Sequence, residues 1–151
     1  MPVHPIIDPM NKKAILVLLI VIVAIGMAYG WMEFNRSKAT ANDMPVKESV
    51  TAEELLGAFN SDETAATARF VGKAEQVIQV KGTIRSIETS DEKHTNVILD
   101  TGDDLAGVVC EFANTDLDPN WSTGSAVVVN GFCTGMLLDI VLVRCSKAPT
   151  K

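Results

Sequence analysis

Ile78-Gln79-Val80-Lys81-Gly82-Thr83-Ile84-Arg85 alternates apolar and polar residues over its whole length. A period of two is typical of a β-strand that buries one face and exposes the other. Gly82 lies on the apolar side of this pattern, where a glycine marks a bulge or a sharp bend. Small barrels need such a bend where one strand turns a corner. The stretch therefore predicts a long, bent first strand.

Four further strands are predicted after it, separated by turn signals. They cover residues 96–100, 105–112, 125–133 and 138–145. A connector separates the third strand from the fourth. Five strands with this spacing, and a glycine bend in the first, predict a mainly β fold, a five-stranded Greek-key barrel. An open antiparallel sheet packed on helices is the alternative. The barrel better explains the long first strand, because one strand must contribute to both halves.

Two short helices are predicted ahead of the strands. Thr51-Ala52-Glu53-Glu54 fits a capping box, with Thr51 as the N-cap and Glu54 at the third helical position. Asn60 to Glu63 repeats the signal and opens a second helix over 62–70, which Gly72 ends. The barrel is thus expected to carry two helices at its amino-terminal side.

Residues 14–32 are nineteen uncharged, mostly apolar residues, preceded by Lys12 and Lys13. At about 1.5 Å per residue the run spans about 28 Å, close to the hydrocarbon thickness of about 30 Å. Tyr29 and Trp31 lie at its carboxyl end, where aromatic rings favour the membrane interface. We therefore expect an uncleaved transmembrane anchor. The first alternative is a cleaved signal, whose apolar core is usually only about 7–15 residues long. The second is a soluble core helix, which would show a polar face.

The chain is expected to divide into five segments. These are an N-terminal tail (1–13), the anchor (14–32), a flexible linker (33–50), the barrel with its N-terminal helices (51–146) and a C-terminal tail (147–151). The linker contains Pro45 and is rich in small and polar residues, a composition typical of a tether. The folded part should begin near Val50.

The orientation of the anchor follows from the segments beside it. Two lysines before the run are matched by Arg36 and Lys38 after it, so nearby positive charge does not choose a side. The short amino-terminal tail and the acidic portion after the anchor favour export of the latter. We expect a single-pass protein of the cell membrane with its domain on the periplasmic, extracytoplasmic side.

The segment after the linker is acidic. Residues 51–151 hold 15 Asp and Glu against 8 Lys and Arg, a net charge of −7. Proteins that bind nucleic acid gain affinity by placing Lys and Arg on phosphates, so this balance disfavours a nucleic-acid partner. Solubility and mutual repulsion are the simpler explanation of the charge.

Five segments of the chain form a recognisable set. They are 51–56, 78–84, 97–100, 110–112 and the run 131–142, Gly-Phe-Cys-Thr-Gly-Met-Leu-Leu-Asp-Ile-Val-Leu, which is the most specific. Together they resemble the tRNA_anti-like family of bacterial proteins. The resemblance covers residues 51–146 and implies an oligonucleotide/oligosaccharide-binding (OB) barrel, commonly attached to a membrane by an amino-terminal anchor or lipid. It carries over no catalytic residue, ligand residue or cofactor. Since the first cysteine is Cys110, a helix must provide the anchor here.

The candidate binding residues are Lys81, Arg85 and Phe132. Lys81 and Arg85 are expected to point outward from the first strand, and Phe132 is the aromatic residue expected to face solvent. The loops 89–95 and 134–137 complete the expected contact region. Proteins that bind single-stranded nucleic acid need outward aromatic platforms, and this domain has few aromatic residues.

Catalytic and metal chemistry find little support in the sequence. His94 is the sole histidine after the anchor, without a nucleophile motif around it, so we expect no enzyme. The turn with Asp100, Asp103 and Asp104 lacks the alternating ligands and terminal Glu of a helix-loop-helix calcium site, so we expect no metal and no cofactor.

Cys110, Cys133 and Cys145 lack CxxC spacing. In a five-stranded barrel the third and fifth strands are parallel neighbours, which brings Cys110 toward Cys145. We therefore expect a Cys110–Cys145 disulfide in an oxidising compartment. In the cytoplasm all three would be buried thiols.

The sequence thus favours a membrane-tethered, non-enzymatic binding module that contacts a protein or an envelope glycan. A nucleic-acid adaptor facing the cytoplasm and a structural subunit of an envelope complex are the alternatives.

Overall fold

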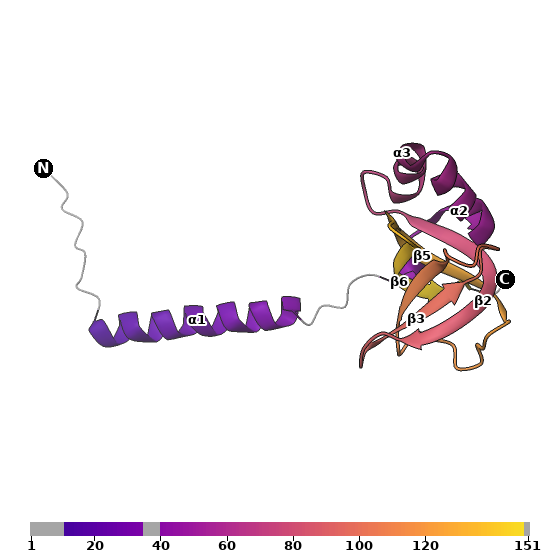
Figure 1. The fold of residues 1–151 in the computed structure, drawn as a ribbon. Helices are drawn as coiled ribbons and strands as arrows, with labels where there is room; N and C mark the ends of the chain where they lie inside the picture. Colours follow the sequence, from indigo (N-terminus) through magenta and orange to yellow (C-terminus); the bar gives the residue numbers. More distant parts are fainter. Residues whose placement is uncertain (1–10, 35–39, 150–151) are drawn as a thin grey trace, which may run out of the picture. The chain divides into compact units, whose positions relative to one another are not determined.

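The computed structural model describes residues 11–34 and 40–149, which belong to two separate units. The first contains the helix α1 (Lys12–Phe34), and the second is a β-domain. Both are drawn in Figure 1. The N-terminal tail before residue 11, the linker residues 35–39 and the last two residues of the C-terminal tail lie outside the described residues.

Helix α1 is exposed along its whole length and has no polar face. Its 23 residues extend the expected span by two residues at each end, and the helix is long and apolar enough to cross a membrane. These properties fit both a membrane anchor and a signal sequence.

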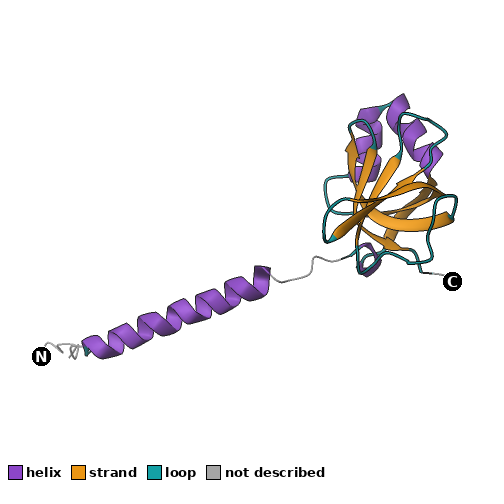
Figure 2. Ribbon diagram, turned by 60° about the horizontal axis from the view of Figure 1, so that its bottom comes forward, coloured by secondary structure: helices purple, strands orange, loops and turns teal. Residues whose placement is uncertain are grey.

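The domain is a closed barrel of five strands, as predicted. The strands are β2 (Val77–Thr89), β3 (His94–Leu99), β4 (Val108–Ala113), β5 (Ala126–Met136) and β6 (Ile140–Lys147). They follow one another around the barrel in the order β2-β3-β4-β6-β5, and β5 pairs again with β2. The β4–β6 pair is parallel and the other four are antiparallel. Figure 2 shows the strands wrapped around a common interior.

Strand β2 closes the barrel by serving both halves. Its first part pairs with β5 as far as Thr83, and its second part pairs with β3 from Ile84 onward. A register shift between Ile84 and Ser86 marks a bulge where the partner changes. Gly82 lies against Leu99, where an added Cβ would stand 3.3 Å from the Leu99 Cβ. Gly82 itself pairs regularly with Val127, so the irregularity expected at this glycine lies instead between Ile84 and Ser86.

The two expected helical segments are present. Helix α2 (Ala52–Ser61) begins with the capping box of Thr51 and Glu54, and Asp62 caps the short α3 (Glu63–Ala66), which continues as a π-turn, η2 (Thr67–Val71). Phe59 and Phe70 stack with their ring centroids 6.2 Å apart. Both rings join the apolar interior of the barrel, so the helices cover one end of it (Figures 1 and 2).

The prediction of a flexible linker over residues 33–50 is wrong for the second half of that segment. A short 3-10 turn, η1 (Ala41–Asp43), and a sixth strand, β1 (Val46–Thr51), fold onto the barrel, with β1 parallel to the first part of β2. Among residues 40–50, only Ala41 and Val50 are buried, so most side chains of this segment are polar and resemble those of a linker. Backbone pairing with β2, which leaves no periodic signal in the side chains, orders the rest.

Two strands are shorter at their starts than the sequence suggested. Leu105 and Leu138 were expected inside strands, but both lie in exposed turns, because Asp103 and Asp139 accept backbone hydrogen bonds there. Strand β4 therefore begins at Val108 and β6 at Ile140.

Candidate functional site

Lys81 lies where two grooves adjoin on the outside of the barrel. One groove has a volume of about 460 Å³ and the other of about 770 Å³, and both are lined by Lys81 together with residues 126–128 of β5. Lys81 is exposed, and its amine makes no hydrogen bond or ion pair with the described residues. The residue predicted from the alternation of β2 thus presents a free cation between two hollows.

The larger groove combines amide groups with one aromatic ring. Gln79 donates to the side-chain oxygen of Asn130 at 3.1 Å, and Asn130 donates to the side-chain oxygen of Asn42 at 3.0 Å. Trp121 and Lys147 line the groove as well. This mixture of amides, an indole and ammonium groups suits a ligand with many hydroxyl or carbonyl groups.

Lys147, which lines this groove, forms an ion pair with Asp118. Lys147 Nζ lies 2.5 Å from Asp118 Oδ2. The hydrogen bond from Lys147, followed by one from the Asn120 backbone, lowers the pKa of Asp118. The smaller groove adds hydroxyl and carboxylate groups from Thr51, Glu53, Thr83 and Asp100.

Arg85 does not join Lys81 in one basic strip. It lies in the bulge of β2, and its guanidinium Nη1 donates to the Asp103 carbonyl oxygen at 2.9 Å. The same group packs over Gly107, where an added Cβ would meet Nη2 at 2.3 Å. Arg85 therefore fastens the loop between β3 and β4.

Phe132 was expected to face solvent, and this is wrong. Its ring leaves the barrel interior but is only 4% exposed, because Ala41 and Val77 cover it in a small separate cluster. The Arg144 guanidinium carbon stands 3.9 Å from the ring centroid, and Arg144 also pairs with Glu75 at 2.6 Å. The covering segment was taken for a linker, so the sequence could not show that this surface is occupied.

The expected contact loops 89–95 and 134–137 are shorter in the structure, because β2 ends at Thr89, β3 begins at His94 and β5 continues to Met136. The remaining loops lie at opposite ends of the outer face of β3 and β4. The β2–β3 loop is tied to the end of β4, where Asn114 donates to the Lys93 and Glu92 carbonyls at 2.8 and 3.1 Å. The β5–β6 loop is tied to the start of β4, where Gly107 donates to Asp139 Oδ1 at 2.7 Å. Between them, Asn96, Ile98, Val109 and Glu111 form a half-buried, mixed surface.

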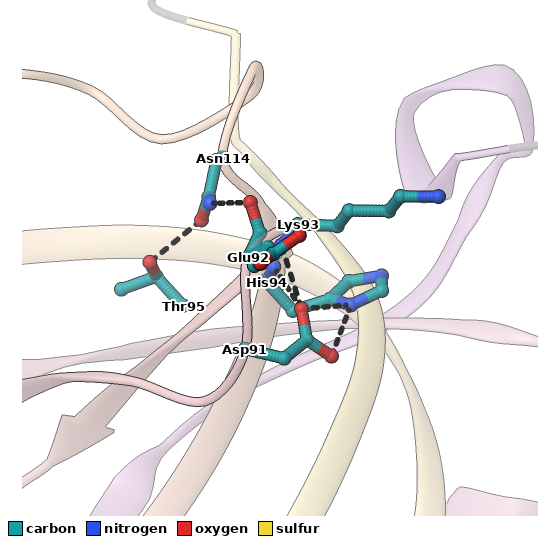
Figure 3. Close-up of polar contacts among 6 residues, drawn as sticks. All are labelled: Asp91, Glu92, Lys93, His94, Thr95 and Asn114. Atoms are coloured by element: carbon teal, nitrogen blue, oxygen red, sulfur yellow. Dashed lines mark hydrogen bonds and ion pairs between the residues drawn. The ribbon is translucent and has the colours of Figure 1, made fainter.

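His94 is paired with Asp91 in a tight turn (Figure 3). Asp91 Oδ1 accepts hydrogen bonds from the backbone N–H groups of Lys93 and His94 at 2.7 and 2.8 Å, and both carboxylate oxygens lie 3.0 Å from His94 Nδ1. The hydrogen bond with Asp91 raises the pKa of His94, with smaller contributions from the charges of Asp91 and Glu111. The same bond lowers the pKa of Asp91. The Asp91–His94 pair therefore stabilises the turn between β2 and β3.

The three cysteines lie buried on adjacent strands and are thiols in the structure. The parallel pairing of β4 and β6 places Phe112 beside Cys145 and Cys110 beside Leu142. Burial raises the pKa of Cys133 and, more strongly, that of Cys145. The neighbourhood expected for a Cys110–Cys145 disulfide is present, and the bond itself remains a prediction.

Two aspartates of the turn that was considered as a calcium site accept hydrogen bonds from backbone N–H groups. Asp100 accepts from the Gly102 N–H at 3.0 Å, and Asp103 accepts from the Leu105 N–H at 2.8 Å. Over residues 11–34 and 40–149, no group of three or more His, Cys, Asp or Glu side chains is placed to hold a metal ion.

With this geometry established, comparison with known proteins identifies the family. The model of the tRNA_anti-like family matches residues 9–147. The chain belongs to the tRNA_anti-like family. No curated protein matches the sequence.

A solved structure has the same fold as this tRNA_anti-like domain. The crystal structure of a suspected nucleic acid-binding lipoprotein from Klebsiella pneumoniae subsp. pneumoniae MGH 78578 superposes with a TM-score of 0.51 at 15% sequence identity. The alignment covers 67% of this chain and 92% of that one. At this identity the likeness establishes the fold alone.

The described part of the tRNA_anti-like domain offers no exposed ring for base stacking. Phe59, Phe70, Phe112 and Phe132 are buried, and Trp121 is half-buried with its ring edge-on to Phe112 at 5.4 Å between centroids. Sequence reasoning found Lys81 but missed the grooves beside it. Their walls come from β1, β5 and the C-terminal segment, which no local pattern in β2 brings together.

Proposed function

We propose that this protein is a membrane-anchored, non-enzymatic binding module. Its barrel holds a protein or an envelope glycan in the two grooves around Lys81. The observation that carries the proposal is the exposed Lys81 amine, placed between hollows that are lined by amides, hydroxyls and Trp121. An amine beside neutral hydrogen-bonding groups favours a ligand with carboxylate, hydroxyl or carbonyl groups.

The anchor is supported by α1 and by the extent of the family match. The helix is apolar on all sides, so water is a poor solvent for it, and the match begins at residue 9, ahead of the helix. A cleaved signal would be a variable leader, and we would expect it to lie outside the region that the family model matches. We propose that α1 stays attached and that the domain faces the extracytoplasmic side.

The lack of catalysis is proposed from the state of the reactive side chains. The imidazole of His94 is paired with a carboxylate, and no described hydrogen bond connects it to a Ser, Thr or Cys. Burial raises the pKa of the Cys133 and Cys145 thiols, which disfavours the thiolate that a nucleophile needs.

A nucleic-acid adaptor is the second candidate, and the name of the Klebsiella pneumoniae lipoprotein favours it. The net charge of −7 over residues 51–151 and the buried aromatic rings oppose it, because counterion release and base stacking supply the affinity of such proteins. A structural role in an envelope complex is the third.

A photo-crosslinking amino acid at Val128 tests the proposal in native membranes, because Val128 lines both grooves. We expect a crosslinked protein or glycan adduct that disappears in a Lys81→Ala background. The matched control is Lys93→Ala, which removes an exposed lysine from the β2–β3 loop, and the adduct should persist there. An adduct that nuclease destroys would replace the proposal with the nucleic-acid adaptor. An adduct unaffected by Lys81→Ala would remove Lys81 from the site.

The side of the membrane is tested separately. Protease added to intact spheroplasts should degrade the domain, because we place it outside the cytoplasm. Protection of the domain until the membrane is permeabilised would reverse the proposed orientation.

A further inference from the structure

Exposed leucines gather on two loops of the barrel. Leu105, in the loop between β3 and β4, is 81% exposed, and Leu137 and Leu138, between β5 and β6, are 96% and 70% exposed. Within residues 40–149, Val46 is the other large apolar residue with an exposed side chain, at 40%. Single exposed leucines are ordinary, but three on adjoining loops form a patch of the kind that marks a contact surface.

Hydrogen bonds join the two loops. The Gly107 N–H donates to Asp139 Oδ1 at 2.7 Å, and the Ile140 N–H donates to the Gly107 carbonyl at 3.0 Å. Both loops therefore lie at the end of the barrel where β4 and β6 begin. We call the loops 100–107 and 137–139 the leucine tip.

The leucine tip carries negative charge around its apolar residues. Asp100, Asp103, Asp104 and Asp139 lie within the two loops, and Arg85 is the cation that reaches them, through the Asp103 carbonyl. Asp104 makes no hydrogen bond or ion pair with the described residues. Loops that expose leucines together with carboxylates are complementary to apolar side chains flanked by Lys or Arg.

An anionic lipid surface is a poor fit for the leucine tip. The chain enters the domain at η1, where Asn42 donates to the Lys147 carbonyl at the far end of β6. The eight residues of β6 extend for about 26 Å, so η1 lies at the end of the barrel opposite the leucine tip. Anionic lipids would also be repelled by the aspartates.

We propose that the leucine tip is a docking site for a protein segment with apolar side chains flanked by Lys or Arg, such as a cationic amphipathic helix. The leucines supply the apolar contact, and the aspartates select positive flanks and set the orientation of the segment. The leucine tip shares Asp100 with the smaller Lys81 groove, but Asp104 and the three leucines line neither groove, so docking at the tip does not depend on the ligand of the grooves.

A synthetic amphipathic helix of Leu and Lys is the probe, titrated into the full-length protein in nanodiscs of zwitterionic lipid. NMR signals of the Gly102 and Gly107 amides report binding at the leucine tip. We expect the Leu137→Ser/Leu138→Ser variant to bind the peptide about 10-fold more weakly, and Asp104→Asn to bind it about 3-fold more weakly with a smaller salt dependence. Val46→Ser and Glu63→Gln, which change an exposed apolar residue and an exposed carboxylate elsewhere, should bind as the parent does.

Three results would overturn the proposal. One is unchanged affinity in the leucine variant, provided its melting temperature matches the parent. Another is equal binding of a Leu and Glu helix of the same length, since charge selection would then be absent. The third is a response of the Gly102 and Gly107 signals to anionic vesicles and not to the peptide, which would make the tip a lipid contact. Lys81→Ala should leave peptide binding unchanged, so failure of the proposed function is distinguished from failure of the docking site.

Discussion

Gly131 on β5 faces the side chains of β6 at a distance that leaves no room for a methyl group. An added Cβ would lie 2.7 Å from the Cys145 sulfur and 3.0 Å from Leu142 Cδ2. Both neighbours are fully buried, so neither can move into solvent. We predict that Gly131→Ala lowers the free energy of unfolding by about 1–3 kcal/mol, the usual cost of overpacking a core. Denaturant titration of the full-length protein in detergent measures the change.

Gly57 is the matched control for that substitution. It lies in α2, is exposed, and has no neighbouring atom within 4 Å of an added Cβ. Gly57→Ala should therefore raise the free energy of unfolding by about 0.5–1 kcal/mol, since alanine loses less backbone entropy in a helix. A Gly131→Ala protein as stable as Gly57→Ala would contradict the packing of β5 against β6.

His94 should titrate above its ordinary pKa of about 6.5, because the hydrogen bond with Asp91 favours the imidazolium. A pKa that is raised on folding stabilises the fold below the unfolded-state pKa, and this contribution is lost as pH rises through the folded-state pKa. The loss therefore falls above pH 6.5. Imidazole chemical shifts followed by NMR measure the pKa directly. Asp91→Asn should move it back toward the ordinary value, and an unchanged pKa in that variant would contradict the pairing.

At the level of single residues, the sequence predicted orientation better than burial. The alternation of β2 placed Lys81 on the outer face correctly, because strand geometry alone decides which face a residue takes. Phe132 also leaves the barrel interior, yet Ala41 covers it from a position about ninety residues away in the chain. Burial of an outward residue depends on what packs over it, and no local pattern reports that.

Among the elements, β1 carries a prediction about where the folded domain begins. A chain starting at residue 40 should fold, because it keeps β1, the buried Val50 and the Thr51 cap of α2. A chain starting at residue 52 should fail to fold or melt far lower. It loses the pairing with β2 and a helix cap worth about 1 kcal/mol. Circular dichroism melts of the two fragments, purified in parallel, would show equal stability if β1 contributed nothing.

The other elements were predictable because their signals are local. A capping box located α2, and a period of two located strands of the barrel. The second capping box, expected over Asn60 to Glu63, was misplaced, because Asn60 lies inside α2 and Asp62 caps α3. The predicted first residues of strands were less accurate, because an apolar residue in a turn cannot be distinguished by its pattern from the start of a strand. Leu105 and Leu138 show this, and both belong to the leucine tip. An exposed apolar residue next to an aspartate that caps a turn is the signal that could have distinguished them.

For the whole molecule, the oxidation state of the cysteines reports the compartment. If the domain is exported, we expect a Cys110–Cys145 disulfide, because both residues are buried on β4 and β6, which pair side by side. Protein taken from native membranes and unfolded without reductant should then show one alkylatable thiol, Cys133, by mass spectrometry. Three alkylatable thiols would reject the disulfide. A reduced control should give three.

Membrane attachment is the property on which the tethered function depends, and α1 allows a direct test. The full-length chain should remain with membranes after an alkaline wash, and its intact mass should include α1. Arginine at Ile22 and Ile25, near the middle of the helix, should each oppose insertion by about 2.5–3.5 kcal/mol, which is enough to release a single span. The Gly57→Ala protein, whose anchor is unchanged, is the control and should stay bound. A mature chain that begins after residue 30, or an arginine variant that sediments with membranes as fully as the control, would show that α1 does not hold the domain at the bilayer.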